Sequence, residues 1–176
     1  MKKKNRLQEF ARYVSLNVMG MIGLSCYILA DTFFVSKGLG TDGLTALNLA
    51  IPIYNFIHGS GLMIGMGGGT RYSIQKSQED HKAANRTFTH TLYLAAVFAV
   101  IFVAVGLLFA GDIVYLFGAR DNVYTMSRTY LRVILLFAPA FLLNNVLLCF
   151  VRNDGAPQLS MAAMIGGSLS NVVLDW

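Results

Sequence analysis

The sequence predicts an all-α fold, a polytopic membrane helix bundle with five spans. Of the 176 residues, 55% are hydrophobic and only 13% are charged, whereas a soluble domain carries about 25% charged residues. The apolar residues are gathered into five long blocks that short polar segments separate. Each block has about the 20 residues that a membrane helix needs. Such a chain has too little polar surface to cover itself in water, so we expect an integral membrane protein.

The elements follow from this pattern in order. Residues 1–12 are basic and are expected to form a cytoplasmic lead-in. The glycine-rich segment 37–43 predicts a tight turn, and the polar stretch 71–86 predicts the main inner loop. The transmembrane part is expected to cover 13–176, with spans at about 13–36, 44–70, 87–110, 126–151 and 159–176.

The basic residues indicate how the chain lies in the membrane. If the spans alternate from a cytoplasmic N-terminus, ten of the 14 Lys and Arg residues fall inside and four fall outside. This distribution follows the positive-inside rule. It predicts a multi-pass protein of the inner (cytoplasmic) cell membrane with its N-terminus in the cytoplasm. The net charge of +5 is therefore explained by topology, so the expected partner is the lipid bilayer and no nucleic acid is expected.

Two acids, Asp31 and Asp175, lie inside long apolar stretches, unlike the other seven. A carboxylate at membrane depth costs about 2.5–3.5 kcal/mol on insertion scales, so it indicates ion binding or proton transfer. The alternative is a carboxylate that reaches outward to water at the membrane interface. Tyr27 lies one turn before Asp31. Ser168 and Asn171 share a helix face with Asp175 because they are three and four residues apart, and this stripe of oxygen atoms suits Na⁺ or a proton.

Other residues in the spans indicate helix packing. Gly61, Gly65 and Gly69 recur every four residues, a spacing that lets helices approach closely in lipid; a flexible gating segment is the alternative. Pro52 and Pro139 are expected to kink their helices, either as static bends or as hinges. The remaining polar groups in the spans are expected to hydrogen-bond between helices; they include Asn144, Asn145 and His58. Possible lining residues of a substrate cavity are Tyr27, Asn144, Asn145 and Ser168.

Five segments of this sequence also resemble a known family. They are Ala30-Asp-Thr-Phe-Phe-Val-Ser36, Gly38-Leu-Gly-Thr-Asp-Gly-Leu-Thr-Ala-Leu47, Leu143-Asn-Asn-Val-Leu147, Arg152-Asn-Asp-Gly-Ala-Pro157 and Asn171-Val-Val-Leu-Asp175. With them the chain resembles the multidrug and toxic compound extrusion (MATE) family of antiporters, and within it the bacterial DinF-like and MepA-like subgroup.

The resemblance implies five spans of a six-helix N-terminal lobe in a twelve-helix transporter. It implies export of amphipathic or cationic small molecules in exchange for H⁺ or Na⁺, with no other cofactor. Asp31, Asn171 and Asp175 match the family's cation-binding cluster, and they would ligate Na⁺ if that ion drives transport. The sixth helix and the second lobe are absent, so a truncated fragment that lacks its C-terminal lobe is expected.

Three alternatives remain. A lipid-linked sugar flippase of the same superfamily would usually need basic cavity residues, whereas the central charges here are acidic. An intramembrane aspartyl protease would resemble Y-D and G-x-G-D motifs, but Ala30 precedes Asp31 and Leu174 precedes Asp175, so no enzyme is expected. The third alternative is a non-functional membrane fragment.

Overall fold

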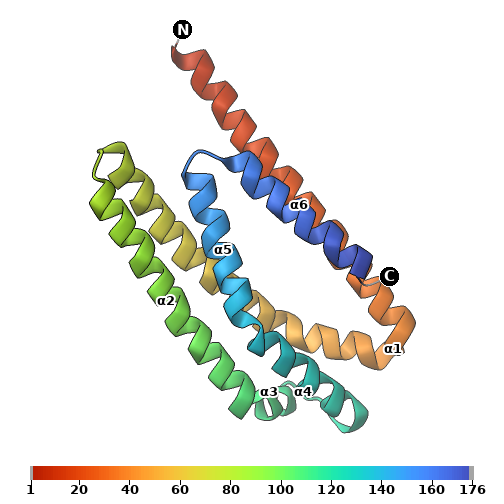
Figure 1. Cartoon of the computed structure of the whole chain (residues 1–176). Coiled ribbons are helices and arrows are strands. Elements are labelled where there is room, and N and C mark those ends of the chain that lie inside the picture. Colours follow the sequence, from red (N-terminus) through yellow and green to blue (C-terminus); the bar gives the residue numbers. More distant parts are fainter. Residues whose placement is uncertain (1, 175–176) are drawn as a thin grey trace.

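The computed structural model describes residues 2–174, without the side chains of 2–9, 13, 24, 27, 171, 172 and 174. The described part contains six helices and no strand, so the all-α prediction is confirmed. The helices are α1 (Lys2–Ser77), α2 (His81–Leu108), α3 (Ala110–Leu116), α4 (Asp121–Leu136), α5 (Ala138–Asn153) and α6 (Pro157–Leu174). Figure 1 shows them as an elongated bundle.

Helix α1 reverses direction at a single residue. Gly40 has φ 63° and ψ −150°, a combination that is essentially restricted to glycine because any Cβ would be strained there. The sequence predicts a seven-residue turn at 37–43, whereas the structure is helical on both sides of Gly40. The two halves of α1 therefore spread apart as a V, and the other helices pack on them (Figure 1).

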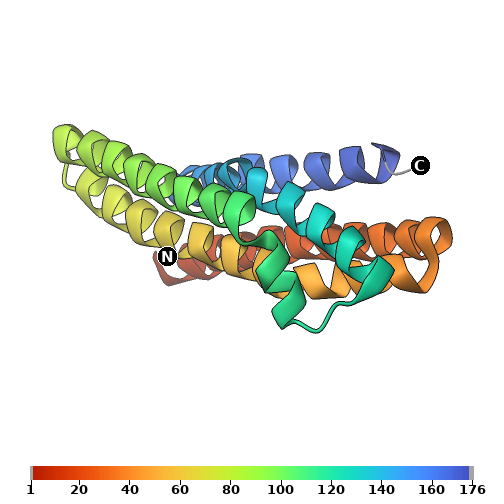
Figure 2. The same ribbon diagram turned by 90° about the horizontal axis from the view of Figure 1, so that it is seen from below.

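The core lies where the second half of α1 meets α2, α4 and α5. Ile57, Leu131, Leu135 and Leu142 are fully buried there and belong to one cluster. A second cluster nearer the α1–α2 turn contains Ile64, Ala95, Val146 and Phe150. The first half of α1 contributes no residue to either cluster and packs instead along α6 (Figures 1 and 2).

The region expected as one span at about 126–151 is a broken helix. Helix α4 ends at Leu136, α5 begins at Ala138, and the two axes are bent by 46°. Pro139 lies in the first turn of α5, where proline's missing N–H leaves no intrahelical bond unmade. Pro52, by contrast, lies inside the helical run of α1.

Two helices in the described residues are long and apolar enough to cross a membrane. They are Phe10–Ser77, which contains an 18-residue stretch with a mean hydropathy of 1.8, and His81–Leu108, which contains one with a mean hydropathy of 2.6; the bent α4–α5 pair would be a third span. The first is 68 residues long, so its reversal at Gly40 gives it the length for two crossings. The division into five spans stays a prediction.

The turns lie at the two ends of the bundle. The start of α1, the α1–α2 turn and the α5–α6 turn lie at one end, and the Gly40 reversal and the α3–α4 turn lie at the other (Figure 1). At the first end Lys76 pairs with Asp154, and this hydrogen bond raises the pKa of the lysine ammonium group. Arg152 donates to the Asn17 side-chain oxygen at 2.8 Å, which ties the end of α5 to the first half of α1.

Candidate functional site

Asp31 lines a cavity of about 200 Å³ between the two halves of α1 and the α4–α5 pair. Its side chain is partly buried. Aliphatic, aromatic and polar side chains from four segments share the cavity wall; they include Thr32, Ile51, Tyr54, Asn55, Tyr130 and Phe141. Of the described residues that form this wall, Asp31 alone carries a charge at neutral pH. The fold thus places the acid of the first span in a mainly apolar pocket inside the bundle.

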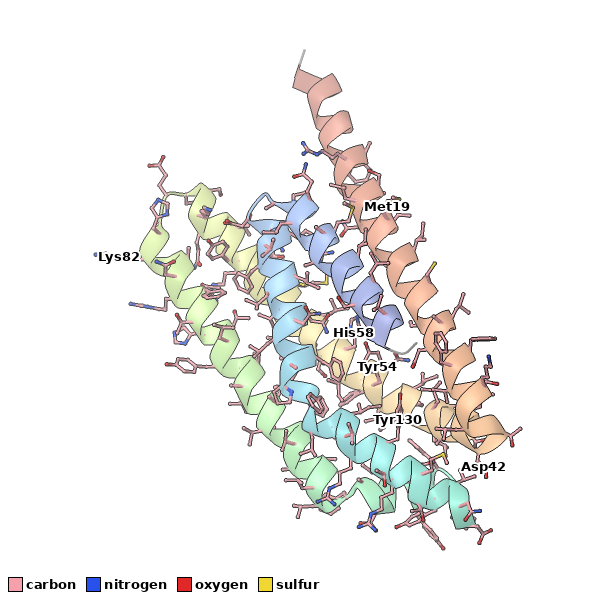
Figure 3. The ribbon with its side chains drawn as sticks, turned by 45° about the vertical axis from the view of Figure 1, so that its right-hand side comes forward. Met19, Asp42, Tyr54, His58, Lys82 and Tyr130 are labelled. Carbon is pink, nitrogen blue, oxygen red and sulfur yellow. The ribbon has the colours of Figure 1, made fainter. Side chains whose placement is uncertain are left out.

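Tyr54 connects the cavity to the packed core. Its ring meets Phe141 edge to face, with centroids 5.4 Å apart, and it stacks on His58 at 6.0 Å. Figure 3 shows Tyr54 and His58 on α1 and Tyr130 on α4. The contact between Tyr54 and Phe141 joins the second half of α1 to α5 at this aromatic wall. Such apolar walls with a few fixed polar groups are typical of small-molecule pockets.

A buried polar contact continues from this wall toward α5. The Asn145 side-chain nitrogen lies 3.0 Å from His58 Nδ1, and Asn145 is 4% exposed. Asn144, the neighbouring residue, is exposed. The two asparagines therefore differ in role: Asn145 forms an interhelical contact, whereas Asn144 points away from it.

The glycine stripe of α1 faces α5. A Cβ on Gly61 would lie 3.0 Å from the Asn145 Cβ, and one on Gly65 would lie 3.0 Å from the Val146 Cα. At Gly69 the nearest atom is the Asn153 side-chain nitrogen, at 2.9 Å. Each glycine thus allows one turn of α5 to approach the α1 backbone, as in other small-residue contacts between membrane helices.

Helix α6 lies beside the first half of α1 and runs in the same direction (Figure 1). Met164 and Ile165 contact Gly20 and Gly23 of α1, 3.2 and 3.5 Å from where a Cβ would be. Ser168 is buried, and its hydroxyl donates to the Met164 carbonyl at 2.9 Å. The Ser168 hydroxyl hydrogen is thus engaged within α6, and Ser168 does not line the Asp31 cavity.

Three of the predicted site residues fall partly or wholly outside the description. Asp175 lies beyond the described residues, and the side chains of Tyr27 and Asn171 are also outside them. The backbone nevertheless relates α6 to Asp31. Asp31 is eleven residues after Gly20, and Leu174 is ten residues after Met164. Since both helices rise about 1.5 Å per residue, the end of α6 lies at the level of Asp31.

Sequence reasoning missed Tyr54, Tyr130 and Phe141 as cavity residues. Aromatic side chains in apolar spans are common, and no spacing relates Tyr130 to Asp31. Asn55 is the one feature that could have indicated this part of the cavity, because it is a polar residue next to Tyr54 in an apolar stretch.

The sequence comparisons identify the family. Residues 18–176 match the sequence profile of the MatE family. The chain belongs to the MatE family. The multidrug export protein MepA of Staphylococcus saprophyticus is 28% identical over 149 residues, which is 85% of this chain and 33% of that protein. MepA of Staphylococcus aureus matches with the same identity and coverage. The chain thus spans about a third of the length of these relatives.

Solved MATE structures have the same fold as this MatE-family chain. A MATE structure in complex with MaD3S superposes with a TM-score of 0.85 at 29% identity, covering 93% of this chain and 37% of that one. An outward-facing multidrug resistance MATE transporter of the MOP superfamily gives 0.79 at 30% identity, over 93% and 37%. A Pyrococcus furiosus MOP superfamily transporter gives 0.82 at 30% identity, over 94% and 36%; its reversed pocket polarity suggests a different function for that protein.

Proposed function

We propose that this chain is part of a secondary active transporter that exports amphipathic, cationic molecules in exchange for H⁺ or Na⁺. The observation that carries the proposal is the position of Asp31 in a cavity whose other described wall residues are neutral. An ionisable residue at membrane depth that faces a cavity marks an ion or substrate path. The relatives named as multidrug export proteins support the same activity.

The chemistry of the Asp31 cavity suits both the exported organic cation and the coupling H⁺ or Na⁺. Tyr54 and Phe141 offer flat apolar surfaces to a planar hydrophobic molecule, and aromatic faces attract cations as well. The carboxylate of Asp31 supplies a full negative charge for an organic cation. The same oxygens can accept a proton or ligate Na⁺, so drug and coupling cation would compete for one group.

Coupling requires a difference in affinity between two conformations, typically about 1–3 kcal/mol. We infer that cation binding at Asp31 removes the negative charge and releases the drug. The end of α6 lies level with Asp31, so Asn171 and Asp175 remain our proposed further oxygen ligands for the cation. The C-terminal half of the relatives would supply the opposite wall of the drug path and is the partner that we expect.

We propose that the end with the α1–α2 and α5–α6 turns faces the cytoplasm, in the inner cell membrane. Ten Lys and Arg residues belong to the segments expected at this end. The fold brings these segments together (Figure 1), as a positive-inside arrangement requires.

A lipid-linked sugar flippase remains the less favoured function. Such a protein must hold a pyrophosphate, for which Arg and Lys are the suitable partners. The described residues that line the Asp31 cavity include neither.

The proposal predicts a charge-specific loss of binding when Asp31→Asn is introduced. Asparagine keeps the size of aspartate but removes its charge, so the affinity for a cationic dye such as ethidium should fall by about tenfold or more, or about 1.4 kcal/mol. The affinity for an uncharged planar dye should stay within about twofold. Binding is measured by fluorescence anisotropy with the purified protein.

Asp42→Asn is the matched control, because Asp42 is an exposed acid just after the Gly40 reversal, away from the cavity (Figure 3). It should leave the affinity for both dyes unchanged. If Asp31→Asn and Asp42→Asn weakened cation binding equally, a general surface-charge effect would replace our assignment of Asp31.

A further inference from the structure

A second cavity, of about 540 Å³, lies between the second half of α1 and α2, near the α1–α2 turn. Its polar end holds Arg71, Arg86, Gln75 and Thr87, and its apolar end holds Met63 and Leu94. The Thr87 hydroxyl donates to the Gln75 side-chain oxygen at 2.6 Å. This bond joins α1 to α2 beside the cavity.

The two guanidinium groups have no acidic partner within ion-pair distance among the described side chains. No acid lines this cavity in the part of the chain that the structure describes. Asp80, in the nearby α1–α2 turn, accepts a hydrogen bond from the Ala83 backbone N–H and caps α2. Two positive charges from different helices thus border one hollow. Arginine pairs its planar donors with phosphate oxygens, often in a bidentate manner, so an anionic phosphate group is the expected ligand chemistry.

The other end of the same hollow is apolar and exposed. Met63 is 66% exposed and Leu94 48%, and Met66 and Val97 extend the exposed apolar surface along α1 and α2. Gly67 lines the hollow, and no atom lies within 4 Å of where its Cβ would be. Figure 1 shows α2 at the outer edge of the bundle, beside the second half of α1. The hollow therefore opens at the outer edge of the bundle that this chain forms.

We propose that this hollow, the α1–α2 groove, binds an anionic glycerophospholipid from the surrounding membrane. Its phosphate is held by Arg71 and Arg86, and its acyl chains lie over Met63 and Leu94 toward the membrane interior. An occupant with a negative head and an apolar tail matches both ends of the groove, whereas a free phosphate would leave the apolar end uncovered. Basic pockets between membrane helices bind anionic lipid headgroups by the same physics. This site is separate from the Asp31 cavity and does not depend on the export activity.

The test measures binding of fluorescent phosphatidylglycerol and phosphatidylcholine to the purified chain in a neutral detergent. The wild-type chain should bind phosphatidylglycerol more tightly than phosphatidylcholine. The double variant Arg71→Gln/Arg86→Gln should lower the phosphatidylglycerol affinity by about tenfold or more. Arg128→Gln/Arg132→Gln, which removes the same charge at the other end of the bundle, and Lys82→Gln, which removes a nearby charge outside the groove, should change it by less than about twofold.

A steric variant tests the groove independently of charge. Gly67→Leu fills the open space while every arginine remains, so it should also lower the phosphatidylglycerol affinity by about tenfold or more. The proposal is overturned if Arg71→Gln/Arg86→Gln binds as the wild type does, or if the Arg128→Gln/Arg132→Gln control loses as much affinity. Displacement of the lipid by millimolar inorganic phosphate would also overturn it, because the ligand would then be a soluble anion.

Discussion

Gly65→Leu is expected to prevent the second half of α1 from packing on α5. A Cβ on Gly65 would lie 3.0 Å from the Val146 Cα and 3.1 Å from the Cys149 Cβ. The nearest of these atoms belongs to the backbone, so no rotamer change of α5 can make room for a leucine. Overpacking usually costs about 1–3 kcal/mol, and here the loss should reach about 3 kcal/mol or more because the entire helix pair must separate.

The measurement is the free energy of unfolding of the purified chain in mixed micelles, without added anionic lipid. Gly67→Leu is the matched control, because it lies two residues further on the same helix and its Cβ would meet nothing within 4 Å. Both variants replace a helical glycine by leucine, so the change in backbone conformational entropy is the same in both and cancels in the comparison. Equal stability of the two variants would contradict the close approach of α1 and α5.

Ile51→Trp should abolish export by the full-length transporter that contains this chain. Ile51 lines the Asp31 cavity and is 40% exposed, so an indole has room to extend without disrupting the core. In a cavity of about 200 Å³ it would occupy the space that the drug needs. The expected result is ethidium accumulation in drug-sensitive cells at the level of cells without the transporter.

Phe56→Trp controls for this substitution, because Phe56 is 66% exposed on the same helix and does not line the cavity. It should export at the wild-type rate at equal membrane abundance. Normal export by Ile51→Trp would mean that the drug does not pass through the Asp31 cavity.

The helical class of this chain could be predicted because it depends on local composition. The long apolar blocks and the spacing of Gly61, Gly65 and Gly69 are visible along the chain, and these glycines do face α5. The exact residues at which the helices break were harder to predict. The reversal needs the one backbone conformation of Gly40, and segment 37–43 contains three glycines, so the sequence alone did not show which would adopt it.

The candidate site was harder to predict, because it joins residues far apart in the sequence. Asp31 could be singled out by its charge in an apolar segment. Tyr130 of α4 and Phe141 of α5 line the same cavity from the two sides of the break at Phe137, where the helices are bent by 46°. Pro139 predicts a kink in this region. The sequence does not show, however, whether this proline lies within one bent helix or in the first turn of a new helix. The partners of Asp31 therefore depend on helix packing that local patterns do not encode.

The most direct test of the central claim is competition between dye and cation for Asp31. The affinity of the purified protein for ethidium is titrated against pH at fixed Na⁺ and against Na⁺ at fixed pH. For the wild type, our account predicts that affinity falls as the concentration of the coupling cation rises. Asp31→Asn should bind weakly and with no dependence on that cation. If the variant kept the wild-type dependence on both cations, Asp31 would not be the group that they share with the drug.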